Sequence, residues 1–299
     1  MACFHAIFYH YFNKYLWRDS RVMKRFFLAF IGALLITISG SYAGDWSKIK
    51  IGTEGAYPPW NGTNAAGELE GAEIDLAADL CARMNAECEL VAQDWDGIIP
   101  ALQNGKYDAI IAGMSITAER MEVINFSQGY ANEPAGFTVL KSSPLGTLKA
   151  SGKVNMDNLT DTSAGYLESL KSALSGFTVG VQGSTTHENF VKQELGGSVS
   201  MKSYDTQQNM ELDLAAGRID AALSDKGSME EFMSTDKGKN LVFVGPDLGG
   251  GPFGGGVGVG LRKADTDLLA MFNKAIDEAR ADGTLAKHFS KWFGKDISM

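Results

Sequence analysis

The sequence is poor in histidine and cysteine. It contains four His and three Cys among 299 residues, and only His187 and His288 lie beyond residue 43. Two histidines so far apart are too few for a metal site, and each is expected to lie at the surface or to cap a helix. The GxSxG, HExxH, GxxxxGK[ST] and CxxC motifs are also missing. Their absence argues against several common hydrolase, metalloprotease, nucleotide-binding and redox functions. No metal or cofactor is therefore expected.

Long apolar runs are scarce, and the clearest one lies near the start. It extends from Phe26 to Ile38, follows two basic residues and precedes a small-x-small exit that ends at Ala43. This order predicts a secretory signal peptide within residues 1–43. A membrane anchor, the alternative, needs about 18 apolar residues. Residues 1–22 precede a better start, so translation begins at either Met1 or Met23.

Positive charge is in deficit, since the formal net charge is −9 at pH 7. Residues 1–43 carry five Lys or Arg and one Asp, so their removal would change the net charge from −9 to −13. Such an acidic chain argues against nucleic acid or anionic lipid as a partner. It is compatible with a cationic ligand.

Two cysteines, Cys81 and Cys88, follow the predicted signal peptide. An even number in an exported chain favours a disulfide, and two buried free thiols are the alternative. On an unbroken helix, residues seven apart are separated by about 10.5 Å along the axis, whereas a disulfide needs Cα atoms within about 7 Å. A disulfide therefore requires the helix that holds Cys81 to end near Asn85.

The remaining chain alternates between strand and helix patterns, which predicts an α/β fold with mostly parallel sheets flanked by helices. The first group of strands is predicted at 48–53, 87–92 and 107–114, with helices at 73–84 and 95–105. Residues 142–175 are polar and are predicted to form an irregular surface insertion. The alternation then restarts with strands at 177–181, 198–204, 218–224 and 241–245. The glycine-rich run 249–260 lacks the Lys and Ser/Thr of a phosphate-binding loop, and it is predicted to lead into a strand.

The two groups of elements predict two lobes. The phrase "LQNGKYDAIIAG" (102–113) is echoed by "LAAGRIDAALSD" (214–225). We expect lobe 1 to comprise 46–133 plus 250–299 and lobe 2 to comprise 141–245. The connections at 134–140 and 245–250 would form a hinge, and hinged lobes close around ligands.

The candidate site lies in the loops that follow the predicted strands, because ligands of α/β sheets bind at the carboxyl ends of strands. These loops contain Glu54, Tyr57, Trp95, Gly113, Ser115, Arg120, Gln182, Thr185, Thr186 and Asp225. Each has an ordinary alternative. Arg120 could hold a carboxylate or be solvated, and Asp225 could accept from an ammonium group or cap a helix. Tyr57 and Trp95 could flank a flat or cationic group or pack in the core. Glu54 could pair with a cation or lie in water, and residues 182–186 could simply begin a helix.

Six segments carry a family resemblance: "GTEGAYPPWN", "GAEIDLAADLCARM", "DWDGIIPALQNGKYDAIIAGMSITAERMEVINFS", "VGVQGST", "LDLAAGRIDAAL" and "GVGVGLRK". Together they resemble the periplasmic amino-acid-binding proteins of ABC importers, above all the lysine/arginine/ornithine-binding and octopine/nopaline-binding members. The likeness covers residues 46–299. It implies a two-lobed periplasmic receptor, not an enzyme, that acts as a monomer and delivers its ligand to an inner-membrane ABC permease.

The resemblance also implies roles for individual residues. Arg120 would bind the ligand carboxylate with Thr185 and Ser115 beside it, and Asp225 would bind the α-amino group. Tyr57 and Trp95 would flank the side chain, and Glu54 would hold its far end. The two cysteines lie where lysine/arginine/ornithine-binding members have their disulfide.

One segment departs from the basic-amino-acid binders. They have two serines where this chain has Ala112 and Gly113, whereas opine binders have small residues followed by Met, as Met114 is here. Small residues would make room beside the α-nitrogen, the atom on which an opine carries its acid substituent. Asp225 instead favours a free amino group, so a basic amino acid and an opine both stay open. A dehydratase-like enzyme of the same fold and a ligand-sensing domain are the alternative functions.

Overall fold

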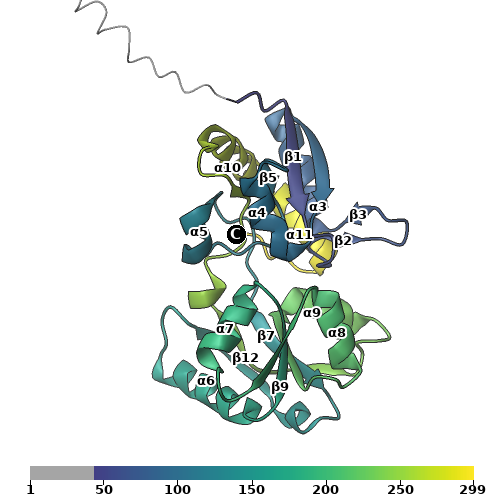
Figure 1. Ribbon diagram of the computed structural model, residues 1–299, viewed down its shortest axis with the longest axis vertical. Coiled ribbons are helices and arrows are strands. Elements are labelled where there is room, and N and C mark those ends of the chain that lie inside the picture. Colours follow the sequence, from purple (N-terminus) through teal and green to yellow (C-terminus); the bar gives the residue numbers. More distant parts are fainter. Residues whose placement is uncertain (1–43) are drawn as a thin grey trace, which may run out of the picture. The chain divides into compact units, whose positions relative to one another are not determined.

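The computed structural model describes residues 44–299, which form one compact unit with two lobes (Figure 1). The predicted signal peptide lies outside the described residues. No helix among residues 44–299 is long and apolar enough to span a membrane. The predicted α/β class is confirmed, because each lobe contains a sheet flanked by helices.

Lobe 1 is built on a five-stranded sheet with the order β4-β1-β5-β13-β6. The strands are β1 (Lys48–Thr53), β4 (Glu87–Ala92), β5 (Ala109–Ile110), β6 (Asn125–Phe126) and β13 (Gly260–Leu261). Strand β1 pairs in parallel with β4 and β5, whereas β13 runs antiparallel to β5 and β6. In β1, Ile49 and Ile51 are buried while Lys48 and Lys50 are exposed, which is the period of two expected for a strand.

The helices of lobe 1 are α3 (Ala72–Met84), α4 (Ile98–Gln103), α5 (Ala118–Val123), α10 (Thr266–Ala281) and α11 (Thr284–Phe293), with the 3-10 helix η1 (Trp95–Gly97). A small hairpin joins β2 (Gly62–Thr63) to β3 (Leu69–Glu70). Apolar residues spaced four apart on α3, such as Leu76 and Leu80, are buried in the core that α10 and α11 also line.

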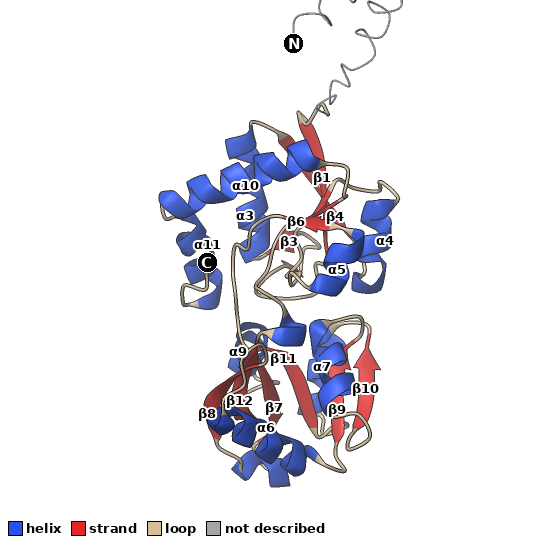
Figure 2. Cartoon of the chain, turned by 90° about the vertical axis from the view of Figure 1, so that its left-hand side faces the viewer, coloured by secondary structure: helices blue, strands red, loops and turns tan. Residues whose placement is uncertain are grey.

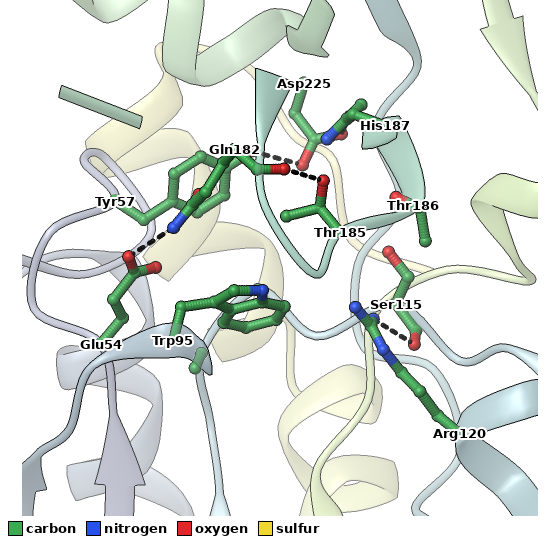
Figure 3. Close-up of a pocket in the computed structure, with 12 residues that line it drawn as sticks. Glu54, Tyr57, Trp95, Ser115, Arg120, Gln182, Thr185, Thr186, His187 and Asp225 are labelled. Carbon is green, nitrogen blue, oxygen red and sulfur yellow. Dashed lines mark hydrogen bonds and ion pairs between the residues drawn. The ribbon is translucent and has the colours of Figure 1, made fainter. Parts of the chain in front are cut away.

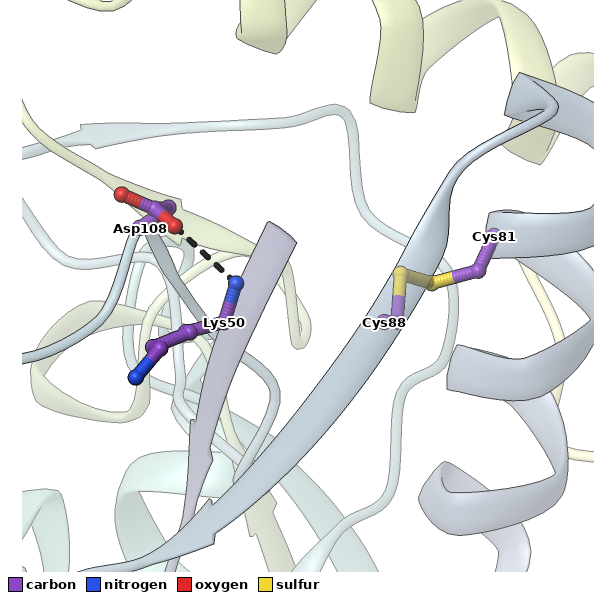
Figure 4. The surroundings of a disulfide bond; sticks show 4 residues. All are labelled: Lys50, Cys81, Cys88 and Asp108. Atoms are coloured by element: carbon purple, nitrogen blue, oxygen red, sulfur yellow. Dashed lines mark hydrogen bonds between the residues drawn. A yellow bond between two sulfur atoms is a disulfide. The ribbon is translucent and has the colours of Figure 1, made fainter. Parts of the chain in front are cut away.

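The disulfide between Cys81 and Cys88 is confirmed, with the two Cα atoms 6.2 Å apart (Figure 4). Helix α3 ends at Met84, and Asn85 adopts the left-handed conformation that often terminates a helix. The chain then turns back into β4, as the disulfide requires.

Lobe 2 is built on a six-stranded sheet with the order β10-β9-β11-β7-β12-β8. The strands are β7 (Ala135–Leu140), β8 (Ala150–Asn155), β9 (Thr178–Gln182), β10 (Ser200–Tyr204), β11 (Ala221–Asp225) and β12 (Leu241–Gly249). The helices are α6 (Asp161–Leu174), α7 (Thr186–Glu194), α8 (Gln207–Ala215) and α9 (Lys226–Ser234), with the 3-10 helices η2 (Pro144–Thr147) and η3 (Gly251–Phe253). Strand β7 is antiparallel to both of its neighbours. Each sheet therefore has a single antiparallel strand, β13 or β7, among strands that run in one direction, and the sheets are mostly parallel as predicted.

Two expectations need correction. Residues 142–175 are not an irregular insertion, because β8 and α6 bury Val154, Leu167 and Leu170 in the core of lobe 2. Residues 135–140 are not a connection but strand β7, and β12 extends to Gly249. The chain instead passes between the sheets at 127–134 and at 250–259.

Candidate functional site

A cavity with an empty volume of about 340 Å³ lies between the lobes, at the carboxyl ends of five strands. Its lining residues are Glu54, Tyr57, Trp95, Ala112, Gly113, Ser115, Arg120, Gln182, Thr185, Thr186, His187 and Asp225 (Figure 3). Lobe 1 contributes the residues up to Arg120, and lobe 2 contributes the others.

The structure brings together all but one of the predicted site residues. Met114 does not line the cavity, because its side chain is fully buried in a core cluster with Ile110 and Ile124. Conversely, His187 lines the cavity and is only 7% exposed, so the expectation of a surface or capping histidine was wrong. The signal that could have identified His187 is its position directly after the predicted binding loop.

Glu54 lies at one end of the cavity and forms a hydrogen bond across the lobes. Its Oε1 atom accepts from Nε2 of Gln182 at 2.7 Å. Burial raises the pKa of Glu54 to about 7, and the bond from Gln182 opposes this shift. No Lys, Arg or His nitrogen among the described residues lies within 4.0 Å of its carboxylate. A ligand cation could therefore pair with Glu54.

Arg120 lies at the opposite end, with its guanidinium 5.2 Å from the centre of the Trp95 ring. Its Nη1 atom donates to the carbonyl of Ser115 at 3.0 Å, and Thr117 caps the short helix that holds it. Within residues 44–299, no carboxylate lies within 4.0 Å of this guanidinium. Burial lowers the pKa of Arg120 to about 10, which leaves the side chain charged at neutral pH. The site thus offers an unpaired cation to an anionic group.

Asp225 lies between these ends and has partners on both carboxylate oxygens. The hydroxyl of Tyr57 donates to Oδ2 at 2.7 Å, and Nε2 of His187 lies 3.2 Å from Oδ1. Although Asp225 occupies the N-cap position of α9, its side chain makes no capping hydrogen bond. The helix-cap alternative is therefore not supported, and the carboxylate is directed into the cavity.

The loop after β9 both begins a helix and lines the cavity. Thr185 caps α7 by accepting from the backbone of Glu188 at 3.2 Å, and it donates to the carbonyl of Gln182 at 2.7 Å. Across the cavity, Nε1 of Trp95 donates to the carbonyl of Ser184 at 3.1 Å. Residues 182–186 thus lead into the start of helix α7, as the helix-start interpretation predicted, and they also line the cavity.

A buried carboxylate on α3 holds two of the cavity loops of lobe 1. Glu73 accepts from the backbone nitrogen of Gly113 at 2.7 Å and from Nδ2 of Asn61 at 2.7 Å, and it also accepts from the hydroxyl of Tyr130. In turn, Oδ1 of Asn61 accepts from the backbone nitrogen of Gly55 at 2.8 Å. The loops at 54–57 and 112–115 are therefore connected through one hydrogen-bond network.

Residues 44–299 contain no group of three or more His, Cys, Asp or Glu side chains placed to hold a metal ion. The arrangement instead combines one cation, two carboxylates and two aromatic rings around a cavity. Such a set can bind a small zwitterion with an additional cationic group.

Known proteins are similar to this chain in sequence and in fold. The model of the family described as bacterial extracellular solute-binding proteins, family 3, matches residues 49–295. An octopine-binding periplasmic protein of Rhizobium meliloti is 39% identical over 285 residues, which cover 89% of this chain and 97% of that protein. An L-arginine-binding protein of Pseudomonas aeruginosa is 36% identical over 275 residues, covering 90% of this chain and 97% of that protein.

One solved structure is also similar to this chain in sequence and in fold. It is the crystal structure of a periplasmic His/Glu/Gln/Arg/opine family-binding protein from Silicibacter pomeroyi in complex with lysine. It matches with a TM-score of 0.67 and 35% sequence identity, and the match covers 84% of this chain and 99% of that chain.

Proposed function

The chain belongs to the bacterial extracellular solute-binding proteins of family 3, and from this membership we propose that it is the receptor of an ABC importer for a basic amino acid or its N-carboxyalkyl derivative, an opine. It works in the periplasm as a monomer. It closes its lobes over the ligand and delivers it to an inner-membrane permease. The names of its relatives support this ligand class, since they include octopine-binding and L-arginine-binding proteins.

The observation that carries the proposal is the distribution of charge along the cavity. Arg120, with no carboxylate partner in the described chain, lies at one end, and Glu54 lies at the other (Figure 3). In the proposed pose the ligand carboxylate binds Arg120, the α-nitrogen binds Asp225 and the distal cation binds Glu54. Two carboxylates and one guanidinium give the lining a net charge of −1, which complements the +1 of arginine, lysine or ornithine.

The first experiment is thermal unfolding of the purified protein with a ligand panel. The panel contains L-arginine, L-lysine, L-ornithine, L-histidine, L-glutamine, octopine and nopaline. A ligand at 1,000 times its Kd adds about 4 kcal/mol, which raises the unfolding temperature by about 8–16 °C for a domain of this size. We expect such a shift with at least one cationic ligand. Equal melting temperatures with every compound would overturn the proposed ligand class.

Arg120→Ala tests the carboxylate site. The expected loss of affinity is about 30- to 1,000-fold, because a desolvated charge pair loses one partner. Arg218→Ala is the matched control, since Arg218 pairs with Asp213 on the surface of lobe 2 with 59% of its side chain exposed. Titration calorimetry measures both variants. An Arg120→Ala affinity within twofold of the unmodified protein would remove this role.

A dehydratase-like enzyme is the second candidate. The observation that favours it is Glu54, whose pKa of about 7 suits a general acid at neutral pH. The hydrogen bond from Gln182 holds that carboxyl group, and the other carboxylate of the cavity, Asp225, is engaged by Tyr57 and His187. Turnover of a prephenate-like acid would favour the enzyme. Stabilisation by a cationic amino acid or opine without any turnover would favour the receptor.

A further inference from the structure

His187 has no part in the ligand pose described above, although it lies within it. It is in the first turn of α7, is 7% exposed and lines the cavity beside Asp225 (Figure 3). The ring of Phe253, from η3, lies 5.9 Å away between ring centres. His187 is the one imidazole among the described residues of this cavity, and imidazole is the side chain that gains or loses a charge near neutral pH.

The partners of Asp225 limit what it can offer a ligand. One oxygen accepts from Tyr57 and the other faces His187, so both are already engaged before a ligand enters. A carboxylate has about four lone-pair sites, which leaves two for ligand donors. A secondary ammonium has two N–H donors, whereas a primary ammonium has three. This arrangement matches a substituted α-nitrogen.

The space beside Gly113 is filled by the Tyr57 ring. A Cβ atom at this position would lie 3.2 Å from Cδ1 and 3.3 Å from Cε1 of Tyr57, and the residue has a φ of +60°. A larger residue would be strained and would press on the ring. The glycine thus lets the Tyr57 ring pack closely against residue 113 and reach Asp225.

A second ligand carboxylate alters the charge balance. With Glu54 ionised and His187 neutral, the charges of Glu54, Asp225 and Arg120 in the lining sum to −1. L-Arginine brings +1 and neutralises the site. Octopine has the same guanidinium but carries an additional carboxylate on the α-nitrogen, so its net charge is zero. One negative charge then stays uncompensated beside Asp225, and a protonated His187 would cancel it.

Resting on the proposed function, we propose that His187 selects for opines by becoming an imidazolium when the N-carboxyalkyl group binds. Its Nε2–H faces Asp225, and its Nδ1 takes one proton from water. The cation compensates the second carboxylate, while Arg120 holds the first. The site therefore takes the class of N-carboxyalkyl basic amino acids, and it takes up a proton with these ligands that it does not take up with L-arginine.

The charged and aromatic groups around His187 come from several elements. Asp225 ends β11, and Tyr57 reaches it from the loop after β1. Phe253 is uncharged, and on α7 itself Glu188 pairs with Lys192. Glu133 lies near Asp225. In the proposed pose, Glu54 binds the guanidinium group of the ligand, which L-arginine and octopine have in common. Because titration of Glu54 affects both ligands alike, it cancels in the ratio of their affinities, and the His187→Gln variant then separates His187 from Glu133.

The test is titration calorimetry with octopine and L-arginine between pH 6.5 and 8.5, in buffers of different ionisation enthalpy. Where one additional proton is taken up, the octopine-to-arginine affinity ratio falls about tenfold for each unit rise in pH. We expect this slope in the unmodified protein, no slope in His187→Gln, and an unchanged slope in His288→Gln. His288 is the matched control, since it lies on α11 and does not line the cavity.

Each outcome of this experiment supports or overturns the proposal. A flat ratio in the unmodified protein, or a slope that survives in His187→Gln, would overturn the proposal. Tight binding of L-arginine with no binding of octopine would also overturn it and would leave the proposed function standing. Failure of both ligands to bind would overturn this proposal, and the full ligand panel described under the proposed function would then decide the ligand class. If His187→Gln does not fold, the buffer dependence of the unmodified protein gives the proton uptake for each ligand directly.

Discussion

Glu54 is a buried carboxyl group. In the proposed pose its negative charge binds the cationic end of the ligand, but burial of that charge destabilises the folded protein when no ligand is bound. Its pKa is raised from 4.5 to about 7 by burial. The folded protein therefore binds more protons than the unfolded chain between about pH 4.5 and 7. Stability from this group is present at low pH and is lost as the pH rises through 7.

Glu54→Gln removes this titration. At pH 8 we expect the variant to be more stable than the unmodified protein without ligand, by about 1–3 kcal/mol. At pH 5 the difference should be small. Thermal unfolding at both pH values measures it, and the comparison isolates Glu54 from Glu133 and Glu211, whose pKa values are also raised. Equal stabilisation at both pH values would show that the ionised carboxylate is not the cause.

The same variant tests the role of Glu54 in binding. L-Arginine should bind Glu54→Gln more weakly, because its guanidinium loses an anionic partner in a desolvated site. L-Citrulline, which has a neutral urea group in place of the guanidinium, should lose little. Calorimetry with both ligands decides the matter. A similar loss for both would place the effect in the shape of the cavity and not in its charge.

At the scale of elements, helix α3 positions the loops on which the cavity depends. Its first turn places Glu73 under Gly113, and Glu73 reaches Gly55 through Asn61. Its other end is joined to β4 by the disulfide. Helix α3 is thus joined to the stabilising disulfide near its C-terminal end and positions the cavity loops through Glu73 in its first turn.

Glu73→Gln should weaken every ligand by a similar factor. The new amide would direct N–H donors at groups that themselves donate, which costs about 1–3 kcal/mol for each buried group left without a partner. Glu70→Gln is the matched control, because Glu70 is exposed on β3. Affinities for L-arginine, L-lysine and octopine measure the effect. A changed order of preference among them would mean that Glu73 contributes to selectivity and does not only hold the loops.

Reduction of the disulfide should lower stability without altering binding. Closing a loop of this length contributes about 2–3 kcal/mol, or a decrease of about 4–12 °C in the unfolding temperature. Cys88 pairs in register with Ile49, far along β1 from the cavity loops that follow Thr53. A Cys81→Ser, Cys88→Ser double variant should therefore keep its affinity for the ligand. A large loss of affinity would show that the disulfide also positions the site.

At the scale of the whole described unit, four hydrogen bonds bridge the lobes at the cavity. Glu54 pairs with Gln182 and Tyr57 with Asp225, while Trp95 and Arg120 both donate to the carbonyl of Ser184. A ligand that contacts both lobes stabilises the conformation in which they approach. We therefore predict that ligand binding closes the lobes about the connections at 127–134 and 250–259.

Small-angle scattering tests this closure. The radius of gyration should decrease when a saturating ligand is added to the unmodified protein. Arg120→Ala, at the same ligand concentration, should show the ligand-free value because it does not bind. Identical scattering with and without bound ligand would contradict a hinged mechanism and would leave a rigid binding site.

Local sequence patterns were sufficient for the parts that depend on neighbouring residues. The alternation in β1, the amphipathic face of α3 and the turn required at Asn85 are all present in the structure. The loops that follow strands line the cavity as expected, because the carboxyl ends of parallel strands meet at one edge of a sheet. The strand and helix within 142–175 were missed, since their buried apolar residues are separated by polar ones.

What the sequence by itself determined about this protein is the order of its elements, its disulfide and most of the residues at its cavity, because these follow from spacing along the chain. Only the tertiary structure decided which side chains meet. It buried Met114, turned His187 towards Asp225 and filled the space beside Gly113 with the ring of Tyr57. The contacts of His187 and of Gly113 join segments far apart in the sequence, each within one lobe. No pattern along the chain predicts them, because they depend on how loops and helices pack around the sheet of each lobe.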